Sequence, residues 1–386
     1  MFDSITITMT DIKRIITNPE AFRPPLQNFY VDFSSGKHYF NPSSEQIYYP
    51  KLTITSTWRN RKPTPCLKVE FSIPKLLFQN NVDELSEDEL ELVIPTLKRK
   101  LNEIGIAASN SDIENAEATP VHFSRNILLT NSTATQVIRA ISKVAISHRL
   151  EFNTRDYKND GKALYIDNNS YQLCLYDKVQ DAFKGSRPAT DKDRTLYQQK
   201  LLKAIKNSRL PIEIFRFEVR ILRKKQLNLL LQKLGLPINP SFRQILNPEL
   251  ATQMLRHHWN LIVPDKSQFL LKFSKPDILT QIINYQKTNR IKLHSAETLA
   301  IAYLIHHCRE YGFRNLEATL ISLYTRRTWY RLSKRYITLI NNLTAHSQPL
   351  SWVEDIEQAL NHYTPLKVSN LEQMYKKSFD IVQTSN

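Results

Sequence analysis

A short alternating segment combines residues that suit phosphate chemistry. In FRFEVRIL, residues 215–222, Arg216, Glu218 and Arg220 alternate with aromatic and aliphatic residues. In a β-strand this spacing places the polar side chains on one face and the apolar side chains against a core. A carboxylate between two arginines is therefore either a solvated charge cluster or part of a site that binds phosphate.

Three further segments show the same division into a polar and an apolar face. If these strands lie in one sheet, their polar faces can converge and bring carboxylates, an imidazole, a phenol and cations together. Taken singly, each strand also fits a solvated sheet face. The polar residues are Glu70 in LKVEFSI, His122 and Asn126 in VHFSRNILL, and Tyr176 and Lys178 in LYDK.

These side chains are suited to cleaving a phosphodiester bond. A divalent metal bound by glutamate and histidine would neutralise a phosphate oxygen. A tyrosine can attack phosphorus and form a covalent intermediate, while arginines stabilise charge on the phosphoryl oxygens. The structural alternatives stay open, because His122 can equally be a hydrogen-bonding core residue and Tyr176 is one of 17 tyrosines.

The charge of the chain favours a polyanionic partner. Among 386 residues, 53 lysines and arginines exceed 37 aspartates and glutamates, a net charge of +16, and nucleic acid is the usual partner of such a surplus. The cysteines, Cys66, Cys174 and Cys308, show neither pairing nor zinc spacing, which indicates a reducing compartment, the cytoplasm. We expect no signal peptide, because the N-terminus lacks a basic start, and no membrane span, because no run of about 18 apolar residues occurs. The six glycines form neither a Walker loop nor a dinucleotide fingerprint.

The order of periodic segments predicts an α+β fold. Alternating strands and amphipathic helices fill residues 1–235, including a helix with a capping box from Ser86 to Glu89 and a helix closed by Gly235. Pro95 either kinks the first of these helices or marks its true start. From about residue 241 the pattern is mostly helical. We therefore expect a catalytic domain over 1–235, a helical domain over 236–345 and a C-terminal tail over 346–386.

The later helices include a segment that suits duplex DNA. Three consecutive helical segments between residues 295 and 342 have the outline of a helix-turn-helix. The segment TRRTWYRLSKRY places basic residues opposite a stripe formed by Trp329, Leu332 and Tyr336, as in a recognition helix. A plain solvated basic helix has the same pattern. The basic residues are Arg326, Arg327, Arg331, Lys334 and Arg335.

The motifs together resemble a known family. VEFSIPKLLFQNN, VHFSRNILL, LYDK, FRFEVRI and the later YGF…RRTWYRLSKRYI follow the order and approximate spacing seen in the gene-two replication initiators of filamentous phages and related plasmids. The resemblance covers residues 65–345. It implies an antiparallel-sheet catalytic domain of the nickase type, followed by a mainly helical domain.

The resemblance also implies an activity. Members of this family nick one strand at a rolling-circle origin, keep the 5′ phosphate on a tyrosine, leave a 3′ hydroxyl for the polymerase and later rejoin the displaced strand. It implies Mg²⁺, with Mn²⁺ as an alternative. The implied partners are duplex and single-stranded origin DNA and the helicase and polymerase of a bacterial host, with no membrane.

The implied site residues follow from matching positions. Tyr176 matches the nucleophile, with Lys178, Arg216 and Arg220 beside it, and Glu218 matches a metal ligand. The family pattern predicts an aspartate on the strand that here reads VHFSRN, where this chain offers His122 and Asn126. Glu70 is an additional candidate ligand. Tyr165, on the partner strand of the same expected hairpin, is the alternative nucleophile.

Three functions remain open from the sequence. The first is an origin-nicking and rejoining enzyme, which requires Tyr176, Glu218 and His122 to converge. The second is a non-catalytic, sequence-specific DNA-binding protein, either a repressor or an inactive initiator. The third is an RNA-binding protein that uses its aromatic residues for stacking.

Overall fold

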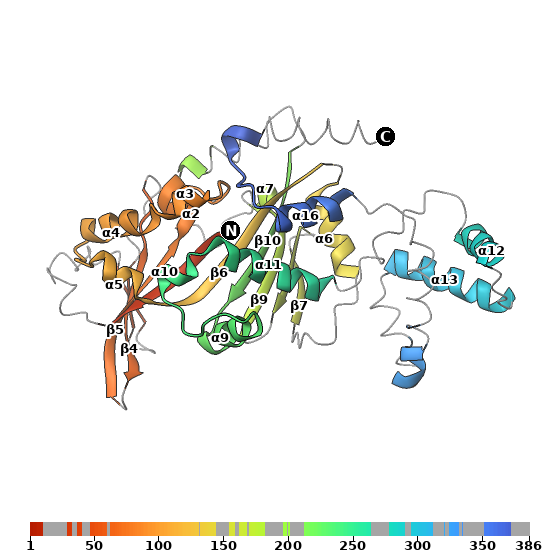
Figure 1. Cartoon of the computed structure of the whole chain (residues 1–386), viewed down its shortest axis with the longest axis horizontal. Helices are drawn as coiled ribbons and strands as arrows, with labels where there is room; N and C mark the ends of the chain where they lie inside the picture. The colour runs from red at the N-terminus through yellow and green to blue at the C-terminus, as the bar shows by residue number, and fades with distance from the viewer. Residues whose placement is uncertain are drawn as a thin grey trace.

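An antiparallel sheet dominates the computed structural model of the chain (Figure 1). Its ten strands lie in the order β2-β3-β4-β5-β1-β6-β10-β9-β8-β7. The strands are β1 (Phe2–Met9), β2 (Phe29–Asp32), β3 (Lys37–Phe40), β4 (Lys51–Arg59), β5 (Lys62–Ser72), β6 (Glu117–Leu129), β7 (Thr154–Lys158), β8 (Ala163–Asp167), β9 (Tyr171–Asp177) and β10 (Glu213–Ile221). The structure describes residues 1–10, 29–32, 37–40, 47–59, 62–130, 132–143, 154–158, 162–167, 170–181, 196–198, 200, 212–263, 278–289, 295–311, 320, 324–331, 334 and 351–371.

Helices occur along the whole described chain, so the fold is mixed α and β, as the sequence predicts. Those of the first half are α2 (Ile73–Phe78), α3 (Glu87–Leu90), α4 (Val93–Glu103), α5 (Asn110–Glu114), α6 (Ala134–Lys143) and α7 (Lys178–Asp181). Those of the second half are α9 (Lys224–Lys233), α10 (Phe242–Ile245), α11 (Pro248–Ile262), α12 (Ile278–Asn289), α13 (Ser295–Tyr311), α16 (Ser351–Asn361) and the 3-10 turn η4 (Val368–Asn370).

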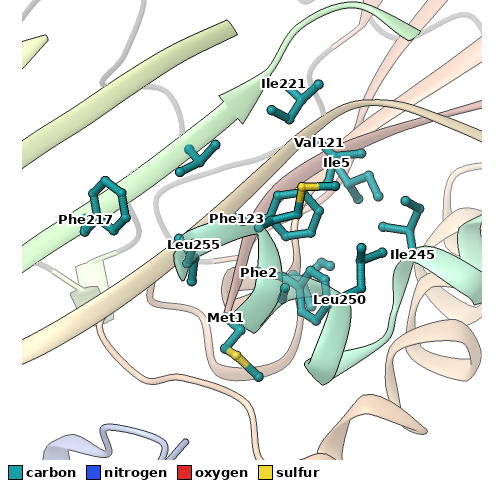
Figure 2. Close-up of a cluster of buried hydrophobic side chains, with 14 of the residues drawn as sticks. Met1, Phe2, Ile5, Val121, Phe123, Phe217, Ile221, Ile245, Leu250 and Leu255 are labelled. Atoms are coloured by element: carbon teal, nitrogen blue, oxygen red, sulfur yellow. The ribbon is translucent and has the colours of Figure 1, made fainter. Parts of the chain in front are cut away.

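The apolar face of the central strands packs against helices. Figure 2 shows side chains of β1, β6 and β10, such as Phe2, Phe123 and Phe217, grouped with Ile245 of α10 and Leu250 of α11. The Phe217 ring meets the ring of Trp259 on α11 edge-on, with centroids 6.0 Å apart. Burial of apolar side chains is the main stabilising contribution to such a core. It also fixes which face of the sheet carries the polar residues, because a one-residue slip would reverse both faces.

Local signals in the sequence set several helix ends as predicted. Ser86 and Glu89 form the reciprocal capping box at the start of α3. Pro95 lies in the first turn of α4, which begins at Val93, so it marks a helix start and not a kink. Gly235, with φ of 72°, follows α9 in the left-handed conformation that glycine adopts without strain.

The hydrophobic core extends past both expected domain boundaries. Apolar residues of α10 and α11, such as Phe242 and Met254, belong to the same buried cluster as β1, β6 and β10. Trp352 and Ile356 of α16 join that cluster as well. The hydrophobic core is therefore not divided at residues 235 and 345, because these amphipathic helices bury their apolar faces against the sheet. Residues 351–371 are an integral part of the fold, not a tail.

Two of the later helices pack against each other. The contact between α12 and α13 includes a 2.9 Å hydrogen bond from Gln286 Nε2 to Thr298 Oγ1. Ile282, Ile301 and Ile305 are buried on these helices. Residues 326–331 are also helical, whereas residues 312–319, which join the expected helix-turn-helix, lie outside the described residues. The helical character of this region agrees with the prediction, and the complete motif stays a prediction.

Candidate active site on the polar face of the sheet

Register aligns the polar residues of three neighbouring strands. On β10, Arg216 lies opposite Tyr176 of β9 and Asn126 of β6. Arg220 lies opposite His122 of β6 in the same register. Side chains directly or diagonally opposite each other on one face of a sheet are within mutual reach. The convergence expected from the sequence is therefore present.

Glu218 lies at the centre of this group. It is 0% exposed. The Tyr176 hydroxyl donates a 3.2 Å hydrogen bond to Glu218 Oε2. Arg220 donates to both carboxylate oxygens of Glu218, from Nε at 2.7 Å and from Nη2 at 3.2 Å. His122 Nδ1 lies 3.6 Å from Glu218 Oε1.

Asp3 is a third potential metal ligand beside Glu218 and His122. Among the described residues, Asp3, His122 and Glu218 each offer one ligand atom, and these atoms lie within 4.8 Å of one another. The pairing of β1 with β6 shifts register between Phe2 and Ile5. Such a bulge changes the facing of the residues within it, so Asp3 reaches Arg216 on the polar face.

Sequence reasoning missed Asp3. Simple alternation assigns Asp3 to the apolar face with Ile5 and Ile7, both buried in the core. The sequence does contain a sign of the bulge, because Asp3 occupies an alternate position with Ile5 and Ile7. In a regular strand the aspartate would then be buried in the apolar core, which is unfavourable. The aspartate that the family resemblance predicts on β6 is thus absent there, and a carboxylate from the neighbouring β1 occupies the site.

Both carboxylates are held ionised by arginines. Burial alone would raise the pKa of Glu218, but Arg220 and, more weakly, Arg216 lower that pKa below its usual value. Burial likewise opposes ionisation of Asp3, whereas the Arg216 guanidinium holds the pKa of Asp3 well below its ordinary range. Arg216 Nη2 lies 2.7 Å from Asp3 Oδ1. The site therefore keeps two anionic groups in a buried environment.

Burial lowers the pKa of His122, although the Glu218 carboxylate acts in the opposite direction. The imidazole is consequently neutral near pH 7, which is the form that binds metals. Its side chain is 23% exposed, so it is the most solvent-accessible of the three candidate ligands.

The donor set fits a divalent cation. Hard cations such as Mg²⁺ and Mn²⁺ take carboxylate oxygens, and Mn²⁺ also accepts imidazole. Ligand distances of about 2.1 Å place neighbouring ligand atoms roughly 3–4 Å apart. Asp3, His122 and Glu218 need only a small closure to reach that spacing, because their donor atoms already lie within 4.8 Å of one another.

Asn126 is engaged with Arg216 and not with the proposed metal ligands. Its Oδ1 accepts a 3.0 Å hydrogen bond from Arg216 Nη1, and its Nδ2 donates to the carbonyl of Val82 at 2.8 Å. Arg216 Nη1 also donates to the carbonyl of Asn81 at 3.1 Å. Asn126 is therefore not placed as the metal ligand that the sequence predicts. It holds the buried guanidinium of Arg216 in position.

Two other expected site residues are not among the converging ligand atoms. Glu70 is exposed on β5, and β1 and β6 separate this strand from β10, so Glu70 is outside the group of converging donors. Lys178 is not on β9, which ends at Asp177, but begins α7. Its buried ammonium group donates to Asn81 Oδ1 at 2.8 Å. Lys178 therefore borders the site through the segment around Asn81.

That segment is tied to the C-terminal part of the chain. Glu84 pairs with Arg125 and accepts hydrogen bonds from the amides of Asn126 and Leu366, at 2.7 and 3.1 Å. The Val368 amide donates to Asp83 Oδ1 at 2.7 Å. These contacts couple residues 366–368 to the residues that hold Arg216. Sequence reasoning missed them, because no local pattern links positions so far apart in the chain.

Tyr165 lies on the same sheet face as the site. It pairs with Cys174, which in turn lies opposite Glu218. Tyr165 packs against Cys174 and Tyr176, so both candidate nucleophiles are near the buried glutamate. The Tyr176 hydroxyl donates a hydrogen bond to Glu218, which makes Tyr176 the first choice as nucleophile.

The basic helix has the expected exposure. Arg326, Arg327, Arg331 and Lys334 are exposed, and Trp329 is buried. This agrees with one basic and one apolar side. Arg335 lies outside the described residues, as do Leu332 and Tyr336.

Comparisons of the chain with protein-family models, with curated proteins and with solved structures found no match. Within the part of the chain that the structure describes, no helix has the length and apolar character needed to cross a membrane.

Proposed function

We propose that the chain is a metal-dependent DNA-nicking and rejoining enzyme of the rolling-circle initiator type. The observation that supports it most is the hydrogen bond from Tyr176 to Glu218 beside Asp3 and His122. A phenol positioned by a buried carboxylate, next to a donor set for a divalent cation, provides the groups that phosphodiester transfer to tyrosine requires.

In the proposed reaction, Tyr176 Oη attacks a phosphodiester phosphorus. Glu218, which accepts the phenolic hydrogen bond, orients the hydroxyl for attack, and the phenolic proton passes to water. A bond forms between the tyrosine oxygen and phosphorus, the bond to the 3′ oxygen breaks, and that oxygen takes a proton from water to become a 3′ hydroxyl. Rejoining is the reverse, with a 3′ hydroxyl attacking the phosphotyrosine. Bound Mg²⁺ or Mn²⁺ would neutralise a phosphoryl oxygen.

The surrounding cations have complementary roles. Arg216 keeps Asp3 ionised and is anchored by Asn126 and the carbonyl of Asn81. Lys178 Nζ lies 5.9 Å from the centre of the Tyr176 ring, and Arg220 contacts the Glu218 carboxylate that holds the phenol, so both supply positive charge near Tyr176. Electrostatic stabilisation by such fixed groups is a large contribution to phosphoryl transfer.

A non-catalytic DNA-binding protein is the competing function. The exposed arginines of residues 326–331 favour it, since phosphate contacts need no catalysis. The buried position of Tyr176, 6% exposed, also fits a purely structural phenol. The two functions differ in one product, a covalent protein–DNA adduct.

The test uses two substrates, supercoiled plasmid DNA and a pool of 3′-end-labelled single-stranded oligonucleotides of random sequence. Each is incubated with the full chain and Mg²⁺ or Mn²⁺ and then separated on a denaturing gel. The proposal predicts labelled DNA that migrates with the protein and is lost with EDTA and in Tyr176→Phe. Failure to form any adduct with either substrate and either metal, by a protein that binds DNA, favours the non-catalytic alternative.

A further inference from the structure

Both carboxylates of the candidate metal site already have guanidinium partners. Arg216 Nη2 lies 2.7 Å from Asp3 Oδ1, and Arg220 contacts Glu218 at 2.7 and 3.2 Å. A divalent cation must therefore compete with an arginine for at least one carboxylate. Which arginine gives way depends on what else holds each of them.

Arg216 is fixed in place. It is 1% exposed, and it also binds Asn126 Oδ1 and the carbonyl of Asn81. Moving its guanidinium would break the buried ion pair with Asp3 and the buried hydrogen bond to Asn126 Oδ1, which is strongly unfavourable. A cation at Asp3 is therefore expected to use the carboxylate while Arg216 stays behind it.

Arg220 has a different environment. Its side chain is 29% exposed. Beyond Glu218, its Nη1 donates to Gln172 Oε1 at 3.0 Å. Gln172 is itself partly exposed, so water can replace Arg220 as its donor. An outward rotation of Arg220 thus exposes a charged group to solvent without leaving a buried group unpaired, apart from the Glu218 carboxylate that a cation would then neutralise.

The two partly exposed residues of the group lie next to each other on the sheet. Arg220 lies opposite His122, the partly exposed member of the metal group. An arginine released there would meet a phosphate held near the cation, and guanidinium groups bind phosphate oxygens in bidentate geometry.

We propose that Arg220 exchanges partners when the site is loaded. Without a divalent cation it pairs with Glu218, and when a cation takes Glu218 it turns outward to bind a phosphate of the nucleic acid strand. Metal and strand then bind with positive coupling, so each raises the affinity of the other by the same factor. This inference rests on the proposed metal site and on the proposed phosphodiester substrate.

The test measures Mn²⁺ binding by titration calorimetry of the full chain, with and without a saturating short (dT) oligonucleotide. In the wild-type protein the oligonucleotide should raise Mn²⁺ affinity about 5- to 100-fold, the usual range of such coupling. Arg220→Gln should bind Mn²⁺ more tightly than wild type without oligonucleotide and should lose most of the coupling. Arg223→Gln is the matched control, because it removes the same charge from an exposed position nearby and should behave as wild type.

Folding is monitored by thermal unfolding of each variant. Mn²⁺ should raise the Tm of Arg220→Gln more than that of wild type, because the cation replaces the missing partner of Glu218. If Arg220→Gln does not fold, Arg220→Lys keeps the charge without the bidentate contact and should show weaker coupling than wild type.

Two outcomes overturn the inference in different ways. Equal Mn²⁺ affinity and equal coupling in wild type and Arg220→Gln refute the exchange and leave the metal site intact. Absence of Mn²⁺ binding in both proteins refutes the metal site itself, and with it the metal dependence of the proposed function.

Discussion

Tyr176 and Glu218 are 42 positions apart in the chain, and the hydroxyl of the first donates a 3.2 Å hydrogen bond to the carboxylate of the second. Tyr176 on β9 is opposite Arg216, so the phenol reaches diagonally across β10 to Glu218. The fully buried carboxylate is ionised through Arg220 and Arg216, as the lowered pKa of Glu218 indicates. It can therefore orient the phenol as a fixed, ionised hydrogen-bond acceptor.

Glu218→Gln is expected to reduce the rate of strand cleavage by about 10²–10³-fold, the usual loss when one preorganised electrostatic group of a site is removed. DNA affinity should change little, because the basic helix is elsewhere in the chain. Cleavage rate and filter-binding affinity are measured in parallel. Glu70→Gln is the control, as it removes a carboxylate from an exposed position on β5. Equal loss of rate in both variants would contradict the role of Glu218.

The strand faces of this site could be predicted from the sequence. Alternation placed Arg216, Glu218, Arg220, His122 and Asn126 on the polar face correctly, because the apolar face of the sheet is buried by α10 and α11. Arg125 is an exception, since it has the parity of Phe123 and is buried against residues 359–364. Alternation failed at Asp3, where the bulge in β1 changes the facing of the chain. It also failed for Lys178, since nothing in LYDK shows that the strand ends at Asp177.

Long-range packing was not predictable by the same means. The apolar stripe of α11 shows that the helix is buried, but not that its partner is the sheet. The contacts of Val368 and Leu366 with Asp83 and Glu84 depend on tertiary structure alone. A domain boundary inferred from a change of secondary structure was therefore misplaced.

Glu84→Gln tests the junction that supports Arg216. The change leaves buried Arg125 without its anionic partner. Breaking one side of a buried pair typically costs about 3–5 kcal/mol of unfolding free energy. Urea unfolding measures this loss. The exposed pair of Glu91 with Arg243 provides the control, and Glu91→Gln should leave stability nearly unchanged. A similarly small effect of Glu84→Gln would show that the buried junction is unimportant to stability.

Asp355 gives the fold a pH dependence that can be removed. Burial raises the pKa of this carboxyl to about 6, although Thr130 donates hydrogen bonds from its amide and hydroxyl. The folded protein therefore binds the proton more tightly than the unfolded chain, and this group lowers stability as pH rises from about 4 to 6.

Asp355→Asn should accordingly raise the Tm at pH 8 relative to wild type and have little effect at pH 4. Linkage limits the gain to roughly 3 kcal/mol, from which the weaker hydrogen bonds to Thr130 subtract about 1 kcal/mol. Thermal unfolding at both pH values tests the sign. Glu354→Gln, at the neighbouring exposed position, serves as control. A lower Tm of Asp355→Asn than of wild type at pH 8 would contradict the raised pKa, because it would show that the ionised Asp355 carboxylate stabilises the folded protein.

Arg327→Ala combined with Arg331→Ala should weaken duplex binding and flatten its salt dependence. Each lost phosphate contact reduces the slope of log affinity against log salt by about 0.9, so the double change should reduce it by nearly two. Arg223→Ala with Lys225→Ala removes the same charge from exposed positions at the start of α9. This control separates a specific contact from net charge. Equal slopes in the two double variants would identify residues 326–331 as an ordinary solvated surface.

The most direct test of the account is to identify the residue that carries DNA in the covalent adduct. The adduct formed with Mn²⁺ is digested with protease and nuclease, and the remaining nucleotide-bearing peptide is sequenced by mass spectrometry. The account predicts a nucleotide on Tyr176, with the adduct abolished in Tyr176→Phe and retained in Tyr165→Phe. A nucleotide on Tyr165 or on any other residue, or an adduct that persists in Tyr176→Phe, would contradict the assignment of Tyr176 as the nucleophile.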